Sequence, residues 1–280
     1  MIETKTHQAP AADRPHIRRK AQPADRWDVA VLDARKGGPA ERLAALFGGL
    51  HPAVVFVVVM LAGLAAIAAL SIGAGFFVTR VLEHASGIAA AEQRFNLWLA
   101  THRTPSRTEA SLIGSIVAGG VVLPIVAGLT GFVCAVLRRW RIAAFVVFAL
   151  AVESASYRAT TLVVHSHRPR VARLENLPVN ASYPSGHTAA SIAVYGGLVL
   201  LLTSRFTSGV FRASAWTFAL AMVAFVAMAR MYRGMHHPLD VAGGVVVGIA
   251  AVIVLVFVCR TAGAVAEARH HARASDGVRG

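Results

Sequence analysis

The sequence predicts an all-α bundle of six transmembrane helices, and composition and hydropathy carry this prediction. Hydrophobic residues make up 56% of the 280 residues and charged residues only 15%, whereas soluble domains average roughly 45–50% and about 25%. Apolar stretches long enough to cross a bilayer, about 20 residues, recur six times. A disordered chain is therefore excluded and an ordinary soluble enzyme is disfavoured. The two cysteines, Cys134 and Cys259, lie inside apolar runs and exclude a disulfide scaffold.

Residues 1–50 form the first element, a polar and basic segment with four prolines and nine Lys or Arg residues. Because this segment has no apolar core, it does not resemble a signal peptide, and we expect a mostly disordered cytoplasmic tail. Its last part, residues 41–50 (ERLAALFGGL), predicts either a short interfacial helix or a frayed start of the first span.

The six expected spans make one membrane domain over residues 51–260, followed by a cytoplasmic tail at 261–280. They lie at residues 52–78, 111–137, 142–164, 188–202, 213–229 and 239–259. The net charge of +14 falls between these spans rather than on one face, so we expect no nucleic-acid partner. Eighteen Lys and Arg residues flank one end of the spans and seven flank the other. The positive-inside rule therefore places both termini in the cytoplasm and the loops 80–110 and 165–187 outside an inner or plasma membrane.

Two further features bear on packing. Residues 88–99 (IAAAEQRFNLWL) predict an amphipathic helix with Phe95, Trp98 and Leu99 on one face. This helix would lie flat in the headgroup layer or serve as an ordinary connector. Gly244 and Gly248 have the spacing that lets membrane helices pack closely, so we expect a structural role for them.

Three polar clusters map to the outer face: residues 165–169 (HSHRP), 183–187 (YPSGH) and 230–240 (RMYRGMHHPLD). Polar residues at the mouths of membrane helices are costly, so such clusters indicate a functional site. We expect the three clusters to converge on one phosphate site.

The middle cluster has the features of an anion cradle. Ser185 occupies an N-cap position before the apolar stretch 188–202, and Gly186 lets backbone N–H groups approach a bound phosphate. A Ser-Gly pair alone would equally fit an ordinary helix cap. His187 follows directly at the membrane surface, which favours the phosphate cradle.

The last cluster predicts a nucleophile and its orienting group. Pro238 fits the first position of the last helix, so Asp240 falls at the third position and can reach back toward His236. A carboxylate that is hydrogen-bonded to one ring nitrogen fixes the tautomer and leaves the other nitrogen free to attack. Alternatively, Asp240 only caps the helix and His236 forms a local hydrogen bond.

Five arginines accompany the clusters. Arg168 and Arg230 offer permanently charged, bidentate donors to phosphoryl oxygens. Arg170, Arg173 and Arg233 are interpreted as residues that extend toward lipid headgroups.

A catalytic metal is not expected. The histidines that map to the outer face are His165, His167, His187, His236 and His237. No cysteine accompanies them, and the only acids between residues 110 and 260 are Glu153, Glu175 and Asp240. Zinc, magnesium and two-metal centres all need a richer ligand set.

The three clusters share the residues of a known three-part signature: Arg168 and Pro169, then Pro184 to His187, then Arg230, His236 and Asp240. This pattern resembles the type-2 phosphatidic acid phosphatase superfamily, which comprises integral-membrane lipid phosphatases and soluble vanadium haloperoxidases. The resemblance implies a six-helix phosphatase without cofactor, acting on a lipid phosphate at the outer membrane surface. It suggests undecaprenyl diphosphate or a phospholipid phosphate as substrate.

The resemblance also implies a role for each residue. His236 would attack phosphorus to give a phosphohistidine, and Asp240 would orient it. His187 would protonate the leaving oxygen and then activate water. The phosphoryl oxygens would be held by Arg168, Arg230, Ser185 and Gly186.

Two positions depart from the signature. Ala229 stands where the family usually has Ser, and Thr161 stands where it usually has Lys. Arg158, one helical turn earlier, would replace the missing cation by reaching toward the site, or would instead pair with Glu153.

Two other functions are considered. The first is a lipid-phosphate-binding or scaffold protein that keeps the pocket but has lost turnover through the Thr161 change. The second is a transporter, which would need inverted repeats or paired broken helices, whereas Pro124 is the one obvious break within a span. Oligomeric state is left open by the sequence.

Overall fold

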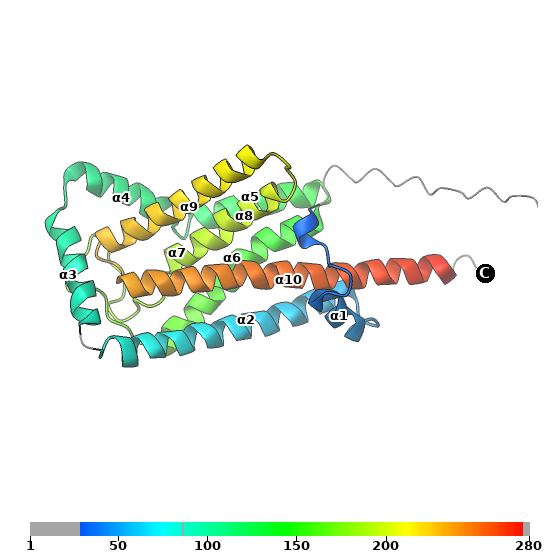
Figure 1. Ribbon diagram of the computed structural model, residues 1–280, viewed down its shortest axis with the longest axis horizontal. Helices are drawn as coiled ribbons and strands as arrows, with labels where there is room; N and C mark the ends of the chain where they lie inside the picture. Colours follow the sequence, from blue (N-terminus) through cyan, green and yellow to red (C-terminus); the bar gives the residue numbers. More distant parts are fainter. Residues whose placement is uncertain (1–28, 86, 277–280) are drawn as a thin grey trace, which may run out of the picture.

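The computed structural model describes residues 29–85 and 87–276, with side chains described through residue 273. Helices lie side by side along the long axis of the molecule (Figure 1). Six helical segments are long and apolar enough to cross a membrane. No strand is found in the described part of the chain beyond an isolated bridge between Ser166 and Ala181. The predicted all-α, six-span fold is confirmed.

The spans differ in how continuous their helices are. Three are single helices, α6 (Trp140–Val163), α9 (Gly209–Tyr232) and α10 (Pro238–Asp276). The first span joins α2 (Pro52–Phe77) to a π-helical turn, η2 (Val78–Leu82), and the second joins α4 (Pro105–Val117) to α5 (Val122–Val136). The fourth consists of α7 (Gly186–Ser191), the π-helical turn η3 (Ile192–Gly196) and α8 (Gly197–Thr203).

The second span is interrupted at a different place from the one the sequence suggested. The helix breaks at residues 118–121, which include Gly119 and Gly120, and not at Pro124. Pro124 lies in the first turn of α5, where a missing backbone N–H breaks no intrahelical hydrogen bond.

The N-terminal segment packs against the far end of α10. A short 3-10 turn, η1 (Ala30–Leu32), precedes α1 (Pro39–Leu46), so the predicted short helix exists but ends before residue 50. Ala44 of α1 packs with Val258 and Val265 of α10. Helix α10 itself continues to Asp276, through most of the segment expected to be a tail. The predicted disorder of residues 1–28 lies outside the described residues.

Helix α3 (Ile88–Thr101) crosses the opposite end of the bundle (Figure 1). Its buried side chains are Glu92, Asn96 and Leu99, whereas Trp98 is 54% exposed. Phe95, Trp98 and Leu99 line one pocket together, as expected of residues on a shared helical face. The polar side chains of Glu92 and Asn96 turn inward to bond the start of α10, as described below.

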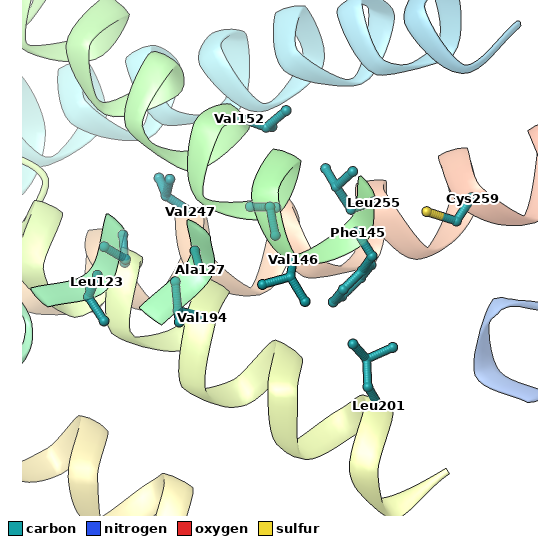
Figure 2. Packing of buried hydrophobic residues seen from close by; sticks show 14 of the residues in the cluster. Leu123, Ala127, Phe145, Val146, Val152, Val194, Leu201, Val247, Leu255 and Cys259 are labelled. Atoms are coloured by element: carbon teal, nitrogen blue, oxygen red, sulfur yellow. The ribbon is translucent and has the colours of Figure 1, made fainter. Parts of the chain in front are cut away.

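The core lies between α5, α6, η3 and α10, where Leu123, Phe145, Val194 and Leu255 pack together (Figure 2). On the outward side of α5, large apolar side chains repeat at helical spacing and are 60–66% exposed: Ile125, Leu129, Phe132 and Val136. An exposed apolar stripe of this kind fits a helix that faces lipid.

Close packing of α7 on α10 depends on two glycines. A Cβ atom on Gly244 would lie 2.4 Å from the carbonyl oxygen of Ser185, and one on Gly248 would lie 2.6 Å from that of Ala189. The structural role predicted for both glycines is confirmed. Their lack of side chains brings the start of α7 directly against the start of α10.

Candidate active site

The three polar clusters lie together at the end of the bundle where α9 ends and α10 begins (Figure 1). The Ser182 backbone N–H donates to the Ser166 carbonyl oxygen at 3.1 Å, which joins the second cluster to the first. The Ser185 N–H donates to the Asp240 carbonyl oxygen at 2.8 Å, which joins the second cluster to the third. Segments far apart in the sequence therefore form one site.

His236 lies in the connection between α9 and α10 and is 2% exposed. Its Nδ1 is 2.8 Å from the Ser182 carbonyl oxygen and 3.8 Å from Asp240 Oδ2. Because a carbonyl oxygen only accepts, Nδ1 carries the proton and the lone pair of the neutral ring is on Nε2. Nε2 has no hydrogen-bond partner among the residues described. This tautomer is the one that a nucleophilic imidazole requires.

Asp240 connects the His236 loop to the start of α10. Its Oδ2 accepts hydrogen bonds from Ser182 Oγ at 2.5 Å and from the His237 backbone N–H at 2.7 Å. Of the two arrangements considered from the sequence, the second is present: the carboxylate caps the helix, and the His236 ring is bonded locally, by the Ser182 carbonyl oxygen. The carboxylate lies near the ring, but 3.8 Å is beyond hydrogen-bond distance. Ser182, whose carbonyl holds the ring, was not singled out by the sequence.

The surroundings of His236 keep its ring neutral. Burial lowers the pKa of His236 and outweighs the opposite effect of the Asp240 carboxylate, and the charges of Arg230 and Arg168 lower the pKa further. At neutral pH the ring therefore has its Nε2 lone pair available.

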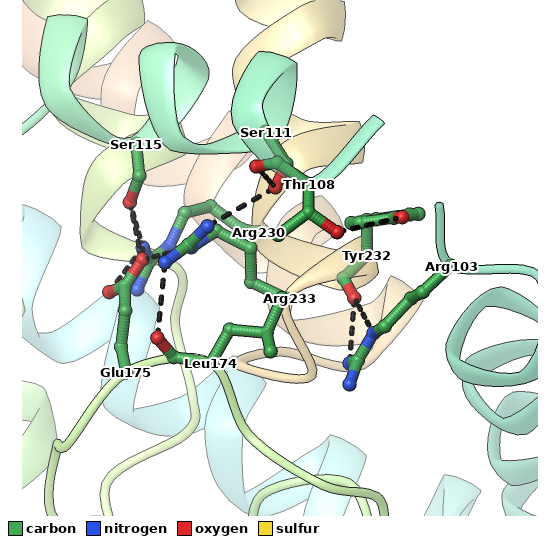
Figure 3. A network of polar contacts seen from close by, with 9 residues as sticks. All are labelled: Arg103, Thr108, Ser111, Ser115, Leu174, Glu175, Arg230, Tyr232 and Arg233. Atoms are coloured by element: carbon green, nitrogen blue, oxygen red, sulfur yellow. Dashed lines mark hydrogen bonds and ion pairs between the residues drawn. The ribbon is translucent and has the colours of Figure 1, made fainter. Parts of the chain in front are cut away.

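Arg230 is fully buried at the end of α9. Its Nη1 donates to Ser115 Oγ and to both carboxylate oxygens of Glu175, at 2.7 Å each (Figure 3). Its Nε and Nη2 have no hydrogen-bond partner within the described residues. A bound oxyanion would satisfy these buried donors, which are costly to leave unpaired.

Arg168 is held by backbone carbonyl groups. Its Nε donates to Pro178 at 2.7 Å, its Nη2 to Ala181 at 2.9 Å, and its Nη1 to Met235. These bonds use three of the five N–H groups of the guanidinium, so two remain for a ligand. Arg168 thus fixes the first cluster against the His236 loop and keeps donors for a phosphoryl group.

The second cluster opens helix α7 as the sequence predicts, with Ser185 at the N-cap position. The Ser185 hydroxyl lies 3.0 Å from Thr188 Oγ1 and does not cap a backbone N–H. A Cβ atom on Gly186 would lie 3.1 Å from the Tyr157 ring, so this ring covers the first turn of α7. His187 is half-buried, and no described residue hydrogen-bonds its ring.

Glu175 is the centre of the arginine network in Figure 3. In addition to Arg230, it accepts from Arg233 Nε at 2.5 Å and from Ser115 Oγ at 2.7 Å. Burial acts to raise the pKa of Glu175, but the hydrogen bonds and charge of Arg230, together with Ser115 and Arg233, lower it to about 2. The carboxylate is therefore ionised throughout the physiological range.

Arg233 does not extend toward lipid headgroups, contrary to the sequence interpretation. Its side chain is 6% exposed, and besides Glu175 it bonds Ser111 Oγ at 3.2 Å and the Leu174 carbonyl oxygen at 3.1 Å. The partly buried carboxylate of Glu175 holds Arg233 inside the bundle. Arg173, by contrast, reaches only the Leu177 carbonyl oxygen of its own loop.

The position of the missing lysine is filled without a new cation. Thr161 Oγ1 donates to the Arg158 carbonyl oxygen at 3.1 Å, and the Arg158 side chain is exposed and bonds no described residue of the site. Glu153 does not pair with Arg158 either: Oε2 accepts from Ser154 Oγ at 3.1 Å, and Oε1 is buried without a partner in the described part. The two alternatives for Arg158 are both absent, and Tyr157 is the side chain of this turn that reaches the site.

The described residues contain no group of three or more His, Cys, Asp or Glu side chains that could hold a metal ion. His165 and His167 are exposed. His237 Nδ1 lies 3.4 Å from Asn96 Nδ2. His165, His167 and His237 therefore form no metal-ligand group with other described residues.

Sequence reasoning missed Ser182, Glu175, Ser115 and Tyr157. One signal was available for Glu175, since it is the only acid in the loop 165–187, which carries three arginines. The other three residues belong to no motif, and their roles follow from tertiary contacts alone.

Comparison with known proteins finds a family match that includes most of this part of the chain. Residues 142–263 match the PAP2 superfamily. A 75-residue segment is 39% identical to an undecaprenyl-diphosphatase of Sulfolobus acidocaldarius. The matched segment is 27% of this chain and 32% of the relative, so the chain spans about a third of the relative's length.

The fold is similar to the crystal structure of a transmembrane PAP2-type phosphatidylglycerolphosphate phosphatase from Bacillus subtilis, with a TM-score of 0.56 and 17% identity. This likeness covers 73% of the present chain and 93% of that one. Residues 142–263 therefore form a PAP2 superfamily domain within a bundle of six helices that can span a membrane.

Proposed function

We propose that this protein is a metal-independent phosphatase that hydrolyses a lipid phosphate or diphosphate through a phosphohistidine intermediate. One observation carries the proposal: Arg230, with two buried and unpartnered nitrogens, shares a site with His236, whose Nε2 is free. The names of the two relatives, an undecaprenyl-diphosphatase and a phosphatidylglycerolphosphate phosphatase, support the same chemistry.

In the first step, His236 Nε2 attacks phosphorus as the bond from phosphorus to the leaving oxygen breaks. His187, in its protonated form, donates its proton to that oxygen. In the second step, His187 takes a proton from water, whose oxygen attacks phosphorus and displaces His236. From a lipid monophosphate the products are the lipid alcohol and inorganic phosphate. From a lipid diphosphate they are the lipid monophosphate and inorganic phosphate, and in both cases the enzyme is regenerated.

Charge that develops on the phosphoryl oxygens is stabilised by donors from all three clusters. Arg230 supplies Nε and Nη2, and Arg168 supplies the N–H groups that its carbonyl partners leave free. The Ser185 hydroxyl and the Gly186 backbone N–H complete the cradle at the start of α7. Donors fixed in advance in a buried site stabilise a transition state strongly.

A lipid substrate fits the placement of the site at one end of the bundle. The hydrocarbon tail would stay in the bilayer while the headgroup enters the pocket. Undecaprenyl diphosphate and a phospholipid phosphate are the two leading substrates. From the distribution of Lys and Arg, both termini are assigned to the cytoplasm and the site to the extracytoplasmic surface. Reporter fusions at the carboxyl end of α10 test this orientation.

The second candidate is a lipid-phosphate-binding or scaffold protein of the same fold. Thr161 in place of the family's lysine favours this function, because the site has one cation fewer.

Phosphate release by the purified protein in detergent separates the two functions. The panel is a polyprenyl diphosphate, phosphatidic acid and phosphatidylglycerol phosphate, each with and without EDTA. We expect release from at least one lipid, unchanged by EDTA and abolished in His236→Ala. His271→Ala, an exposed histidine near the far end of α10, is the matched control. Lipid binding without release identifies a scaffold, and loss of activity in EDTA contradicts the metal-independent mechanism.

A further inference from the structure

Helix α3, which contributes no residue to the three-part signature, presents polar side chains to the active site. Glu92, Asn96 and Leu99 follow the helical spacing i, i+4, i+7 and are 8%, 0% and 6% exposed. Leu97 and Trp98 are about half exposed. Two of these three inward side chains are polar, so the inward face of α3 serves a purpose beyond hydrophobic packing.

That purpose is visible in the contacts with the start of α10. Glu92 Oε1 accepts a hydrogen bond from the Leu239 backbone N–H at 2.7 Å. Leu239 is the second residue of α10, so this N–H is one of the four that a helix leaves without an internal partner. Glu92 thus caps α10 from outside, while Asp240 caps it from within through His237.

Asn96 extends the same contact by one turn. Its Nδ2 donates to the Glu92 carbonyl oxygen at 3.1 Å and lies 3.4 Å from His237 Nδ1. The residues on either side of Pro238 are therefore each bonded by α3. His236, which directly precedes them, is held on its other side by the Ser182 carbonyl oxygen.

Helix α3 also holds the first cluster. The Gln93 side-chain amide donates to the Arg170 carbonyl oxygen at 3.1 Å and accepts from the Arg170 backbone N–H at 3.1 Å. This pair of hydrogen bonds is made two residues from Arg168. One helix therefore ties the loop of a phosphate-binding arginine to the loop of the nucleophile.

The charge of Glu92 suits its place. A carboxylate next to a helix N-terminus is favoured by the partial positive charge of that end. Burial raises the pKa of Glu92 despite its bond to Leu239, and the nearby carboxylates of Asp240 and Glu83 raise the pKa further. The carboxylate is therefore costly to bury, and its bond to the Leu239 N–H offsets part of that cost.

We propose that α3 is a positioning element of the active site, in which Glu92 holds the start of α10 so that His236 Nε2 is aimed at the phosphorus atom. The proposal rests on the phosphatase function above. Glu92 acts through Leu239 and touches no substrate. Its contribution is the geometry of attack, and a displacement of about 1 Å in such a geometry costs roughly 100-fold in rate.

Glu92→Ala and Glu92→Gln separate positioning from mere stability. In Glu92→Ala the Leu239 N–H loses its acceptor, and we expect kcat to fall about 10- to 100-fold with KM within about twofold of wild type. In Glu92→Gln the amide oxygen still accepts from Leu239, and we expect kcat within about threefold of wild type. Glu109→Ala, an exposed acid on α4, is the matched control and should be unchanged.

A rapid-quench measurement of the rate of phosphoenzyme formation distinguishes positioning from a purely structural role, because loss of folded protein alone would not change this rate per folded molecule. In Glu92→Ala the rate of phosphoenzyme formation per folded protein should fall with kcat, because attack by His236 is the slowed step, and the amount that accumulates should fall with it. Wild-type kcat in Glu92→Ala, or an equal loss in Glu92→Gln and Glu92→Ala, overturns the proposal. Where Glu92→Ala does not fold, Asn96→Ala takes its place, and a wild-type kcat there overturns the proposal as well. Failure of the phosphatase function itself is distinct, because wild-type protein would then release no phosphate.

Discussion

Replacing Glu175 by Gln is the change whose effect can be worked out most fully from the structure. The carboxylate binds Arg230 and Arg233, whose side chains are 0% and 6% exposed. Glutamine has nearly the same shape but no charge, so two buried guanidinium groups would lose their counter-ion. Breaking a buried ion pair in this way is far more costly than replacing the whole pair by apolar groups.

The pKa of Glu175 gives the size of the effect. A fall from 4.5 to about 2 corresponds to about 3 kcal/mol of stability at neutral pH, at 1.36 kcal/mol per unit. The side chain is 23% exposed, and solvent screening reduces this figure to about 2 kcal/mol. Because the pKa is depressed in the folded protein, the contribution is complete above about pH 4.5 and is lost as the pH falls toward 2.

The assay is unfolding of Glu175→Gln and wild type in the same detergent, at pH 7.5 and at pH 3.5, with Glu109→Gln as the control for an exposed acid. We expect the variant to be less stable by about 2 kcal/mol at pH 7.5 and by less at pH 3.5. Catalytic efficiency should also fall about tenfold, because Arg230 loses the partner that fixes its Nη1. Equal stability of variant and wild type at pH 7.5, or a difference that does not shrink at pH 3.5, would refute the reasoning.

Three further predictions follow from the same contacts. The acid limb of kcat/KM should lie below 6.5, the ordinary histidine value, because burial lowers the pKa of His236 and only the neutral ring attacks; a midpoint at or above 6.5 in a pH–rate profile contradicts this. Tyr157→Phe should lower kcat/KM about tenfold through loss of one hydrogen bond to a charged phosphoryl group, and a wild-type value would show that the hydroxyl makes no such bond. Gly244→Ala should lose about 1–3 kcal/mol in thermal unfolding, because its Cβ would meet the backbone of α7. Gly128→Ala, whose Cβ meets nothing within 4 Å, should keep wild-type stability.

The fold could be predicted because the length and hydropathy of a segment identify a membrane-spanning helix. Each expected span is present, and most bounds differ by only a few residues. What hydropathy does not show is how a span is subdivided. The interruption at Gly119 and Gly120 leaves the apolar run intact, so the second span looks continuous in sequence although α4 and α5 are separate helices.

The residues of the three polar clusters could be predicted from the sequence, whereas the residues that hold them in place could not. His236, Asp240 and Ser185 lie at helix ends that proline and capping residues mark in the sequence. The interpretation of Arg233 was wrong because no local feature distinguishes a helix-end arginine that faces lipid from one that binds a partly buried carboxylate 58 residues away.

Helix α3 is a second case in which a long-range contact could not be predicted from the sequence. Its pattern of apolar residues predicts the face that carries Trp98 and Leu99. The pattern does not predict that Glu92 turns inward and accepts from the Leu239 N–H, 147 residues away in the chain. This N–H has no partner within its own helix, which makes the contact favourable. Contacts of this range cannot be read from periodicity.

Trapping the covalent intermediate is the most direct test of the two-histidine mechanism. Wild-type protein is mixed with a lipid phosphate radiolabelled in its terminal phosphate, quenched in base, which preserves phosphohistidine, and digested for peptide mapping. Label on the peptide that contains His236, absent from His236→Ala and longer-lived in His187→Ala, is the predicted result. Label that persists in His236→Ala, or turnover by wild type without any labelled histidine, would contradict the account.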